Sequence, residues 1–157
     1  MTAPEIVLRV AGLSDVPLVG NLARGVIRTS YAGAYPPGAI AFFLVYHSDE
    51  AIVERISSGT VLLAEMNGEA VGTGSLVGNE ICGVFVRPDM QGRGIGGIIM
   101  DRLESIAEEK GIRLIELSVS LVSKDFYEKR DFIITRSASI DVGAGERLDY
   151  FEAFKAL

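Results

Sequence analysis

Residues 89–103, with the sequence DMQGRGIGGIIMDRL, concentrate glycines directly in front of a helical pattern of apolar residues. The four glycines are Gly92, Gly94, Gly96 and Gly97. Glycine there costs backbone entropy, so the spacing indicates a ligand that must approach the bare backbone. The first turn of a helix has about four N–H groups without internal partners, and these favour an anion. With Arg93 beside them, the glycines predict a site for a pyrophosphate.

Three ligands could supply that pyrophosphate. A Walker-type loop needs a lysine directly after its second glycine, but Ile98 follows Gly97, so this loop is excluded. The glycines also match the G-x-G-x-x-G pattern of dinucleotide-binding folds, and Glu116 has roughly the spacing of the ribose-binding acid. However, about 40 residues follow Glu116, too few to complete a doubly wound sheet. The third ligand is coenzyme A.

The elements that must position this loop follow from the apolar periodicity. Alternation predicts strands over residues 6–12, 60–66, 69–77, 80–87, 113–120, 132–140 and 147–154. Helical spacing predicts a helix that follows an N-cap at Ser14 and runs to about Thr29, and further helices over 38–57 with an interruption near residue 48, 95–110 and 123–129. The order β-α-α-β-β-β-α-β-α-β-β predicts an α+β fold. We expect a mixed, mostly antiparallel sheet of six to seven strands, about four flanking helices and one parallel crossover around the 95–110 helix.

Length and composition limit the class of protein. The 157 residues are 48% hydrophobic and 23% charged, which predicts one globular domain over residues 1–157. The chain has no apolar run of about 18 residues and no signal-peptide pattern, and Cys82 is its only cysteine. We therefore expect a cytoplasmic protein without a membrane span, disulfide or metal site. A net charge of −6 argues against nucleic-acid binding.

Two motifs resemble the GCN5-related N-acetyltransferase (GNAT) family. VFVRPDMQGRGIGG, residues 84–97, is similar to its acetyl-CoA signature, in which an apolar strand is followed by x-P and Q/R-x-x-G-x-G/A. FYEK, residues 126–129, resembles the family's FYEK-x-G-F segment, with Asp131 in place of the glycine. Ser120 stands where many members have asparagine. The order of elements is also similar, so the resemblance covers essentially the whole chain.

The resemblance implies an acetyl-CoA-dependent N-acetyltransferase that moves the acetyl group directly to a primary amine of a small molecule or peptide. Its co-substrate would bind at Val84, Phe85, Val86, Gln91, Gly92, Arg93, Gly94, Ile95, Gly96, Gly97 and Ser120. The resemblance further implies that the pyrophosphate binds backbone N–H groups from Gln91 to Gly97, and that pantetheine pairs with the backbone of Val84 and Val86. A homodimer is a further expectation, because dimers are common in the family.

Two proton transfers remain to be assigned to side chains. The resemblance gives Tyr127 the role of proton donor to the leaving thiolate. Glu80, at the start of the strand that carries the signature, is the candidate base, acting directly or through water. Glu65 and Tyr31 are weaker candidates. His47 has a suitable intrinsic pKa, but it lies between two helical segments and is expected at the surface.

The sequence leaves the acceptor and one alternative function open. Residues 24–47 and 136–150 are expected to shape the acceptor site, and small amines, aminoglycosides, amino acids and peptides all remain candidates. Cys82 is expected to be a packing residue and not a nucleophile. The alternative function is a non-catalytic regulatory or sensor module that holds acyl-CoA in the same fold.

Overall fold

The computed structural model describes residues 5–157, so residues 1–4 of the expected domain lie outside it. Its strands are β1 (Ile6–Val10), β2 (Thr60–Met66), β3 (Glu69–Val77), β4 (Glu80–Val86), β5 (Leu114–Ser120), β6 (Ile133–Gly143) and β7 (Glu146–Ala156). Its α-helices are α1 (Val16–Val26), α2 (Pro37–Tyr46), α3 (Asp49–Ser58), α4 (Ile95–Glu109) and α5 (Lys124–Glu128). Short 3-10 turns, η1 (Leu13–Asp15) and η3 (Pro88–Met90), precede α1 and follow β4, and a π-helical turn, η2 (Ile27–Tyr31), extends α1.

The described strands form one seven-stranded sheet in the order β1-β2-β3-β4-β5-β7-β6. Every neighbouring pair is antiparallel except β4 and β5, which are parallel and are joined through α4. This confirms the predicted α+β fold and its single crossover. The described part has five α-helices, one more than the approximate expectation, because the predicted helix over 38–57 is divided at its interruption into α2 and α3.

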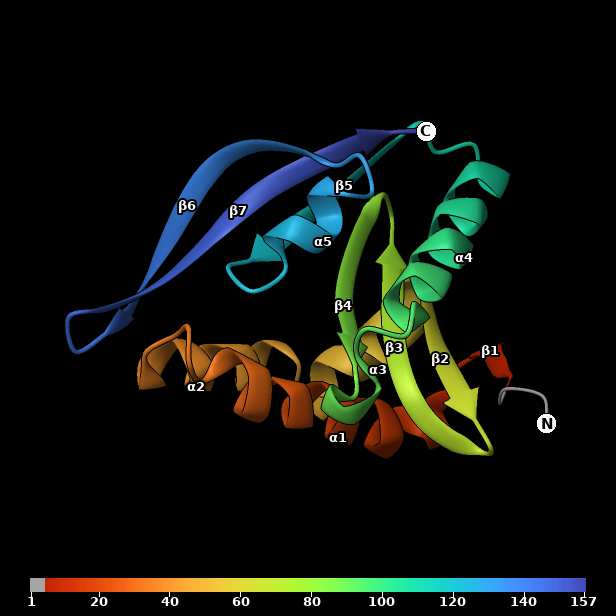
Figure 1. The fold of residues 1–157 in the computed structure, drawn as a ribbon, viewed down its shortest axis with the longest axis horizontal. Helices are drawn as coiled ribbons and strands as arrows, with labels where there is room; N and C mark the ends of the chain where they lie inside the picture. The colour runs from red at the N-terminus through yellow and green to blue at the C-terminus, as the bar shows by residue number, and fades with distance from the viewer. Residues whose placement is uncertain (1–4) are drawn as a thin grey trace.

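The sheet has helices on both faces of β2–β4 (Figure 1). On β2, Leu62 and Ala64 belong to the core that contains α4, whereas Val61 and Leu63 belong to the core under α1 and α3. Helix α4 lies close to β3: a Cβ added to Gly74 would be 2.6 Å from Ile99. This tight contact fixes the N-terminus of α4, and therefore the glycine loop before it, relative to the middle of the sheet.

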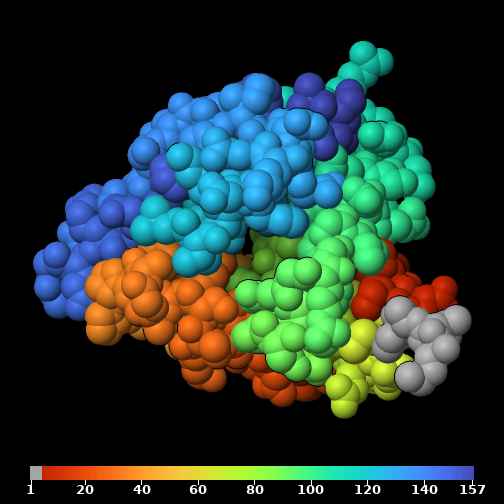
Figure 2. Space-filling model, viewed as in Figure 1, coloured from red at the N-terminus to blue at the C-terminus, as the bar shows by residue number. Residues whose placement is uncertain are grey.

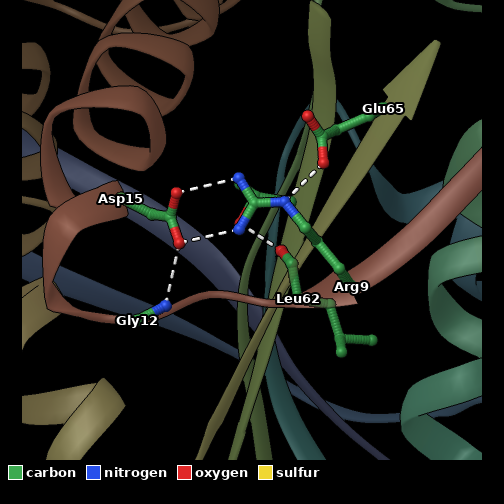
Figure 3. Close-up of polar contacts among 6 residues, drawn as sticks. Arg9, Gly12, Asp15, Leu62 and Glu65 are labelled. Atoms are coloured by element: carbon green, nitrogen blue, oxygen red, sulfur yellow. Dashed lines mark hydrogen bonds and ion pairs between the residues drawn. The ribbon is translucent and has the colours of Figure 1, made fainter. Parts of the chain in front are cut away.

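An ion cluster attaches the first helical layer to the sheet edge (Figure 3). The Arg9 guanidinium donates to both carboxylate oxygens of Asp15 at 2.8 Å and also contacts Glu65 on β2. The Gly12 N–H donates to Asp15 at 2.9 Å. These donors hold the pKa of Asp15 at about 2, with the Arg9 hydrogen bonds as the main cause. The predicted N-cap at Ser14 is therefore one residue early, because Asp15 closes a 3-10 turn first and is itself the N-cap of α1.

No helix within residues 5–157 is both long and apolar enough to cross a membrane. In the same residues, no three His, Cys, Asp or Glu side chains are grouped so that they could hold a metal ion.

Candidate active site between strands β4 and β5

The two parallel strands at the centre of the sheet, β4 and β5, meet at one end and then diverge (Figure 1). They share a single pairing, between Glu80 and Glu116. Farther along β4, the Arg87 N–H donates to the Val71 carbonyl of β3 at 2.9 Å. The Val86 carbonyl belongs to the same peptide group and therefore points to the opposite edge, away from β3. An unpaired strand edge is thus available in the interior of the sheet.

Strand β4 contains a β-bulge at Gly83. Between the pairs Thr73–Phe85 and Ser75–Cys82, β4 has one more residue than β3. Gly83 has a φ of 62°, a left-handed conformation that costs other residues energy. A glycine inside a predicted strand is a known signal for a bulge, so Gly83 could have indicated this one from the sequence. The bulge changes the direction of the backbone N–H groups where the strand begins to diverge from β5.

The glycine loop borders a cavity of about 480 Å³ that also contains the open end of β4. Gly94, with a φ of 82°, is the N-cap of α4. The first backbone hydrogen bond of α4 runs from the Ile98 N–H to the Gly94 carbonyl, 3.1 Å away. Within the described chain, the N–H groups of Ile95, Gly96 and Gly97 have no backbone acceptor. The helix start therefore offers unpaired N–H groups to an anion, as the glycine spacing predicts.

Most of the predicted co-substrate residues line this cavity, namely Val84, Phe85, Val86, Gln91, Gly92, Gly94, Ile95, Gly96 and Gly97. Arg93 is exposed and is not part of the lining. The Gln91 N–H is already bonded to the Pro88 carbonyl, and its side-chain amide donates to the Val86 carbonyl at 3.0 Å. The free N–H groups therefore begin after Gln91, whose side chain lies where an extended ligand would pair with β4.

A second cavity of about 290 Å³ lies between α2 and the β6–β7 hairpin. Its walls include Phe42, Phe43 and Tyr46 of α2 and Leu148 and Tyr150 of β7. Figure 2 shows a hollow bordered by the α2 segment (orange), the α5 segment (cyan) and the green segment of β4 and its following loop. The predicted acceptor ranges, 24–47 and 136–150, are thus brought together around one cavity.

The two cavities meet at five shared residues: Tyr31, Val84, Phe85, Ser123 and Tyr127. The Tyr127 side chain is 7% exposed, and burial raises its pKa well above the ordinary tyrosine value. Its hydroxyl has no hydrogen-bond partner recorded within residues 5–157, so its proton is not committed to another protein group. Tyr127 is therefore a protonated hydroxyl at the junction of the two cavities.

Tyr31 lies at this junction, and Ser120 lies on its second-cavity side. Burial raises the pKa of Tyr31, and the nearby Ser120 and Ser123 hydroxyls offset part of that effect. Ser120 donates to the Ser123 hydroxyl at 3.0 Å and lines the second cavity only. Its hydroxyl is hydrogen-bonded to Ser123, which lines both cavities, and the contact between Ser120 and pantetheine stays a prediction. Ser123 was not identified from the sequence, because a serine before a short helix is a common capping residue.

Glu80 and Cys82 line the second cavity on β4. Glu80 is exposed at the start of the strand, four residues before Val84, which is up to about 13 Å along an extended chain. A carboxylate at that distance reaches the junction through water more readily than directly. Burial raises the pKa of the Cys82 thiol, so this residue stays protonated and is a poor nucleophile. The other base candidate, Glu65, contacts Arg9 at the far edge of the sheet and lines neither cavity.

His47 differs from the sequence expectation. It is 5% exposed, lines the second cavity, and packs edge-on against Phe85 and Tyr46. Burial, followed by the Arg55 charge, lowers its pKa to about 3, so the ring is neutral. Arg55 Nη1 lies 3.0 Å from His47 Nδ1 and can only donate, so the ring proton is on Nε2. The expectation of a surface residue failed because α2 ends at this point and turns the ring inward.

The sequence of the chain matches one family description. A model of the acetyltransferase (GNAT) domain matches residues 31–144, well over half of the chain. The protein belongs to the GNAT acetyltransferase family. This is a family of acyltransferases whose co-substrate is acetyl-CoA. The matched region of this GNAT protein contains the lining of both cavities except for Val26 and Ser30 of the first and Leu148 and Tyr150 of the second.

Solved structures show the same fold at low sequence identity. A GCN5-related N-acetyltransferase (Aminotransferase, Class-II) from Rhodopseudomonas palustris is 24% identical with a TM-score of 0.88, covering 100% of this chain and 98% of its own. PaiA N-acetyltransferase from Thermoplasma acidophilum, solved with coenzyme A, is 21% identical with a TM-score of 0.77, and the match covers 98% of this chain and 99% of that chain. YncA from Salmonella typhimurium, solved with acetyl-CoA, is 19% identical with a TM-score of 0.70, covering 98% and 94%. No curated protein matches this GNAT sequence.

Proposed function

We propose that this GNAT protein is an N-acetyltransferase that moves the acetyl group of acetyl-CoA directly to a primary amine. The main support is that a cavity with free helix N–H groups meets an aromatic cavity at Tyr127 and the bulged strand β4. A two-substrate transfer needs such a junction, because both reacting groups must be held within about 3–3.5 Å of each other.

The first cavity has the chemistry required for coenzyme A. The free N–H groups of Ile95, Gly96 and Gly97 and the α4 dipole favour the pyrophosphate. The open edge of β4 offers backbone groups to the pantetheine amides, as an edge strand does to a peptide. A ligand that pairs there takes the place of the Gln91 side-chain amide at the Val86 carbonyl. Acetyl-CoA supplies the thioester, whose carbonyl would be polarised by a backbone N–H of β4 near the bulge.

Protein groups at the junction account for the proton transfers. The amine nitrogen forms the new bond to the acetyl carbon as the carbon–sulfur bond breaks. Tyr127 gives its proton to the leaving sulfur, and burial keeps that proton on the hydroxyl at neutral pH. Glu80 accepts the amine proton through water. Direct transfer needs no acyl-enzyme. The raised pKa of the Cys82 thiol keeps this residue protonated, and the His47 Nδ1 lone pair accepts from Arg55, so neither group is suited to act as a nucleophile.

Calorimetric titration with acetyl-CoA, with NADH as the control, tests the first cavity. Micromolar binding of acetyl-CoA alone is expected, and release of free CoA on addition of a primary amine then tests the transfer. Binding without CoA release for any amine would instead identify the acyl-CoA-holding module. Absence of acetyl-CoA binding would overturn the proposal, since the free N–H groups would then have no ligand of this kind.

A further inference from the structure

We propose that the acceptor is a small primary monoamine with an aromatic or branched apolar body and no carboxylate beside the amine. This substrate class rests on the proposed N-acetyltransferase function and makes it more specific. It follows from the lining of the second cavity, from the charges that face it and from its size.

The lining of the second cavity is rich in aromatic residues. Seven of its twenty residues are Phe or Tyr: Tyr31, Phe42, Phe43, Tyr46, Phe85, Tyr127 and Tyr150. The rings of Phe42 and Tyr46 are stacked, with centroids 6.3 Å apart and planes within 12°, and both side chains are partly exposed at the cavity. Partly exposed stacked rings favour a flat or branched apolar group that removes their faces from water.

The charges that face the cavity favour a single cation. Glu80 is the only lining residue with a formal charge, because the low pKa of His47 leaves its ring neutral. A protonated amine is attracted by this carboxylate and by the faces of the rings, and it can lose its proton to Glu80 before it reacts. A carboxylate on the acceptor would have to enter beside Glu80 without a cation in the lining to pair with it. That arrangement costs desolvation and like-charge repulsion.

Two arginines lie beside the lining residue His47, and one of them, Arg24, donates to the His47 carbonyl at 3.3 Å and pairs with Asp49. The other, Arg55, also makes its contacts within the protein. Its Nη1 contacts His47 Nδ1, its Nη2 donates to the Tyr46 carbonyl at 2.8 Å, and its guanidinium lies over the Tyr46 ring at 5.3 Å. Arg55 is not part of the lining. It therefore fixes the orientation of His47 and Tyr46, and two of its N–H groups are engaged inside the protein.

Size separates the remaining acceptor classes. At about 290 Å³ the cavity is at the lower limit of small-molecule sites, which suits one ring with a short amine arm. An aminoglycoside or a polyamine would place further cations against apolar walls with only Glu80 to balance them. A peptide would place backbone N–H and C=O groups there without enough partners.

The test measures CoA release from the wild-type protein with four amines: phenethylamine, L-phenylalanine, spermidine and a phenylalanyl dipeptide. Phenethylamine and L-phenylalanine form the decisive pair, because they share the ring and arm and differ only in the carboxylate. We expect kcat/KM for phenethylamine to exceed that for L-phenylalanine by about 100-fold or more, and those for the other two by about 10-fold or more. A separate calorimetric titration with phenethylamine alone should also show binding.

The outcomes separate this inference from the proposed function. If acetyl-CoA binds and spermidine, the dipeptide or L-phenylalanine is the better acceptor, the substrate class is wrong and the transferase proposal stands. The class is also wrong if acetyl-CoA binds but no tested amine binds or reacts. If acetyl-CoA does not bind but phenethylamine does, the second cavity has the proposed preference and the transferase proposal fails.

A pair of variants on α2 provides a structural control. Phe42→Ala removes a partly exposed ring from the cavity, whereas Val45→Ala removes a side chain that is 74% exposed and does not line it. We expect KM for phenethylamine to rise about 10-fold in Phe42→Ala and to remain unchanged in Val45→Ala, with similar melting temperatures for both. Equal KM values for the two variants would overturn the role of the aromatic wall.

Discussion

The bulge at Gly83 makes a quantitative prediction about how backbone shape supports catalysis. In Gly83→Ala the backbone must keep a φ of 62° with a Cβ present, which costs about 1–2 kcal/mol. The new Cβ would also lie 3.1 Å from Arg55 Nη1, a flexible group that can shift. Displacing Arg55 from His47 adds up to about 1 kcal/mol, the net value of one hydrogen bond. The expected loss of unfolding free energy is therefore about 1–3 kcal/mol, up to about 1 kcal/mol more than the backbone cost alone.

Gly78→Ala is a matched control for this variant. Gly78 has a nearly equal φ of 58°, lies in the turn between β3 and β4, and has no atom within 4 Å of the added Cβ. It should lose only the backbone part, about 1–2 kcal/mol. Urea unfolding of both variants, followed by circular dichroism, measures the difference between them.

Steady-state kinetics then tests the functional part of the prediction. If straightening the bulge moves the N–H that polarises the thioester, kcat of Gly83→Ala should fall by up to about 100- to 1000-fold, the range seen when an oxyanion donor is lost. Gly78→Ala should retain the wild-type kcat. A Gly83→Ala protein as stable and as active as Gly78→Ala would refute the reasoning about both the clash and the bulge.

Three further predictions concern single side chains. Tyr127→Phe should lower kcat about 10- to 1000-fold with little change in the acetyl-CoA Kd, whereas an effect confined to Tyr31→Phe would transfer the acid role to Tyr31. Asp15→Asn should lose about 1–2 kcal/mol of unfolding free energy at pH 7. Because the folded pKa of Asp15 is lowered from 3.8 to about 2, this stabilisation is complete above about pH 4 and disappears as the pH falls toward 2. The stabilities of wild type and variant should therefore converge in acid unfolding. Tyr35→Phe should lose about 2–3 kcal/mol in urea unfolding, because its hydroxyl donates to the Asp149 carbonyl and accepts from the Leu121 N–H, and both backbone groups would lose a partner.

The sequence predicted the helices and strands well where the apolar periodicity agrees with the positions of the turn residues. The strands over 60–66 and 69–77 match the structure because Asn67-Gly68 fixes the hairpin between them. The start of α4 at Ile95 followed from the glycines and the apolar spacing. The start of α1 was misplaced, because the Arg9–Asp15 contact that closes the preceding turn depends on tertiary geometry.

For the candidate site, the sequence identified groups that act through the backbone and missed groups whose role depends on burial. The glycine loop and Tyr127 lie in recognisable local motifs. The neutral state of His47 results first from burial, partly against the Phe85 ring of another element, and then from the charge of Arg55, eight residues away. Likewise, only the three-dimensional structure shows that Arg93 is exposed to solvent and that the Gln91 N–H donates to the Pro88 carbonyl. The divergence of β4 from β5 has no local signal at all.

The unpaired edge of β4 also affects how the protein avoids self-association. A strand edge with free N–H and C=O groups usually attracts a strand from another molecule and can start aggregation. Here the edge faces the interior of the sheet, and the Phe126 ring of α5 lies 3.2 Å from where a Cβ on Gly96 of α4 would be. A slim, extended chain such as pantetheine suits such a gap, whereas a β-strand with side chains on both faces is too thick for it. The close approach of α4 and α5 beside this edge thus limits the thickness of any chain that could pair with it.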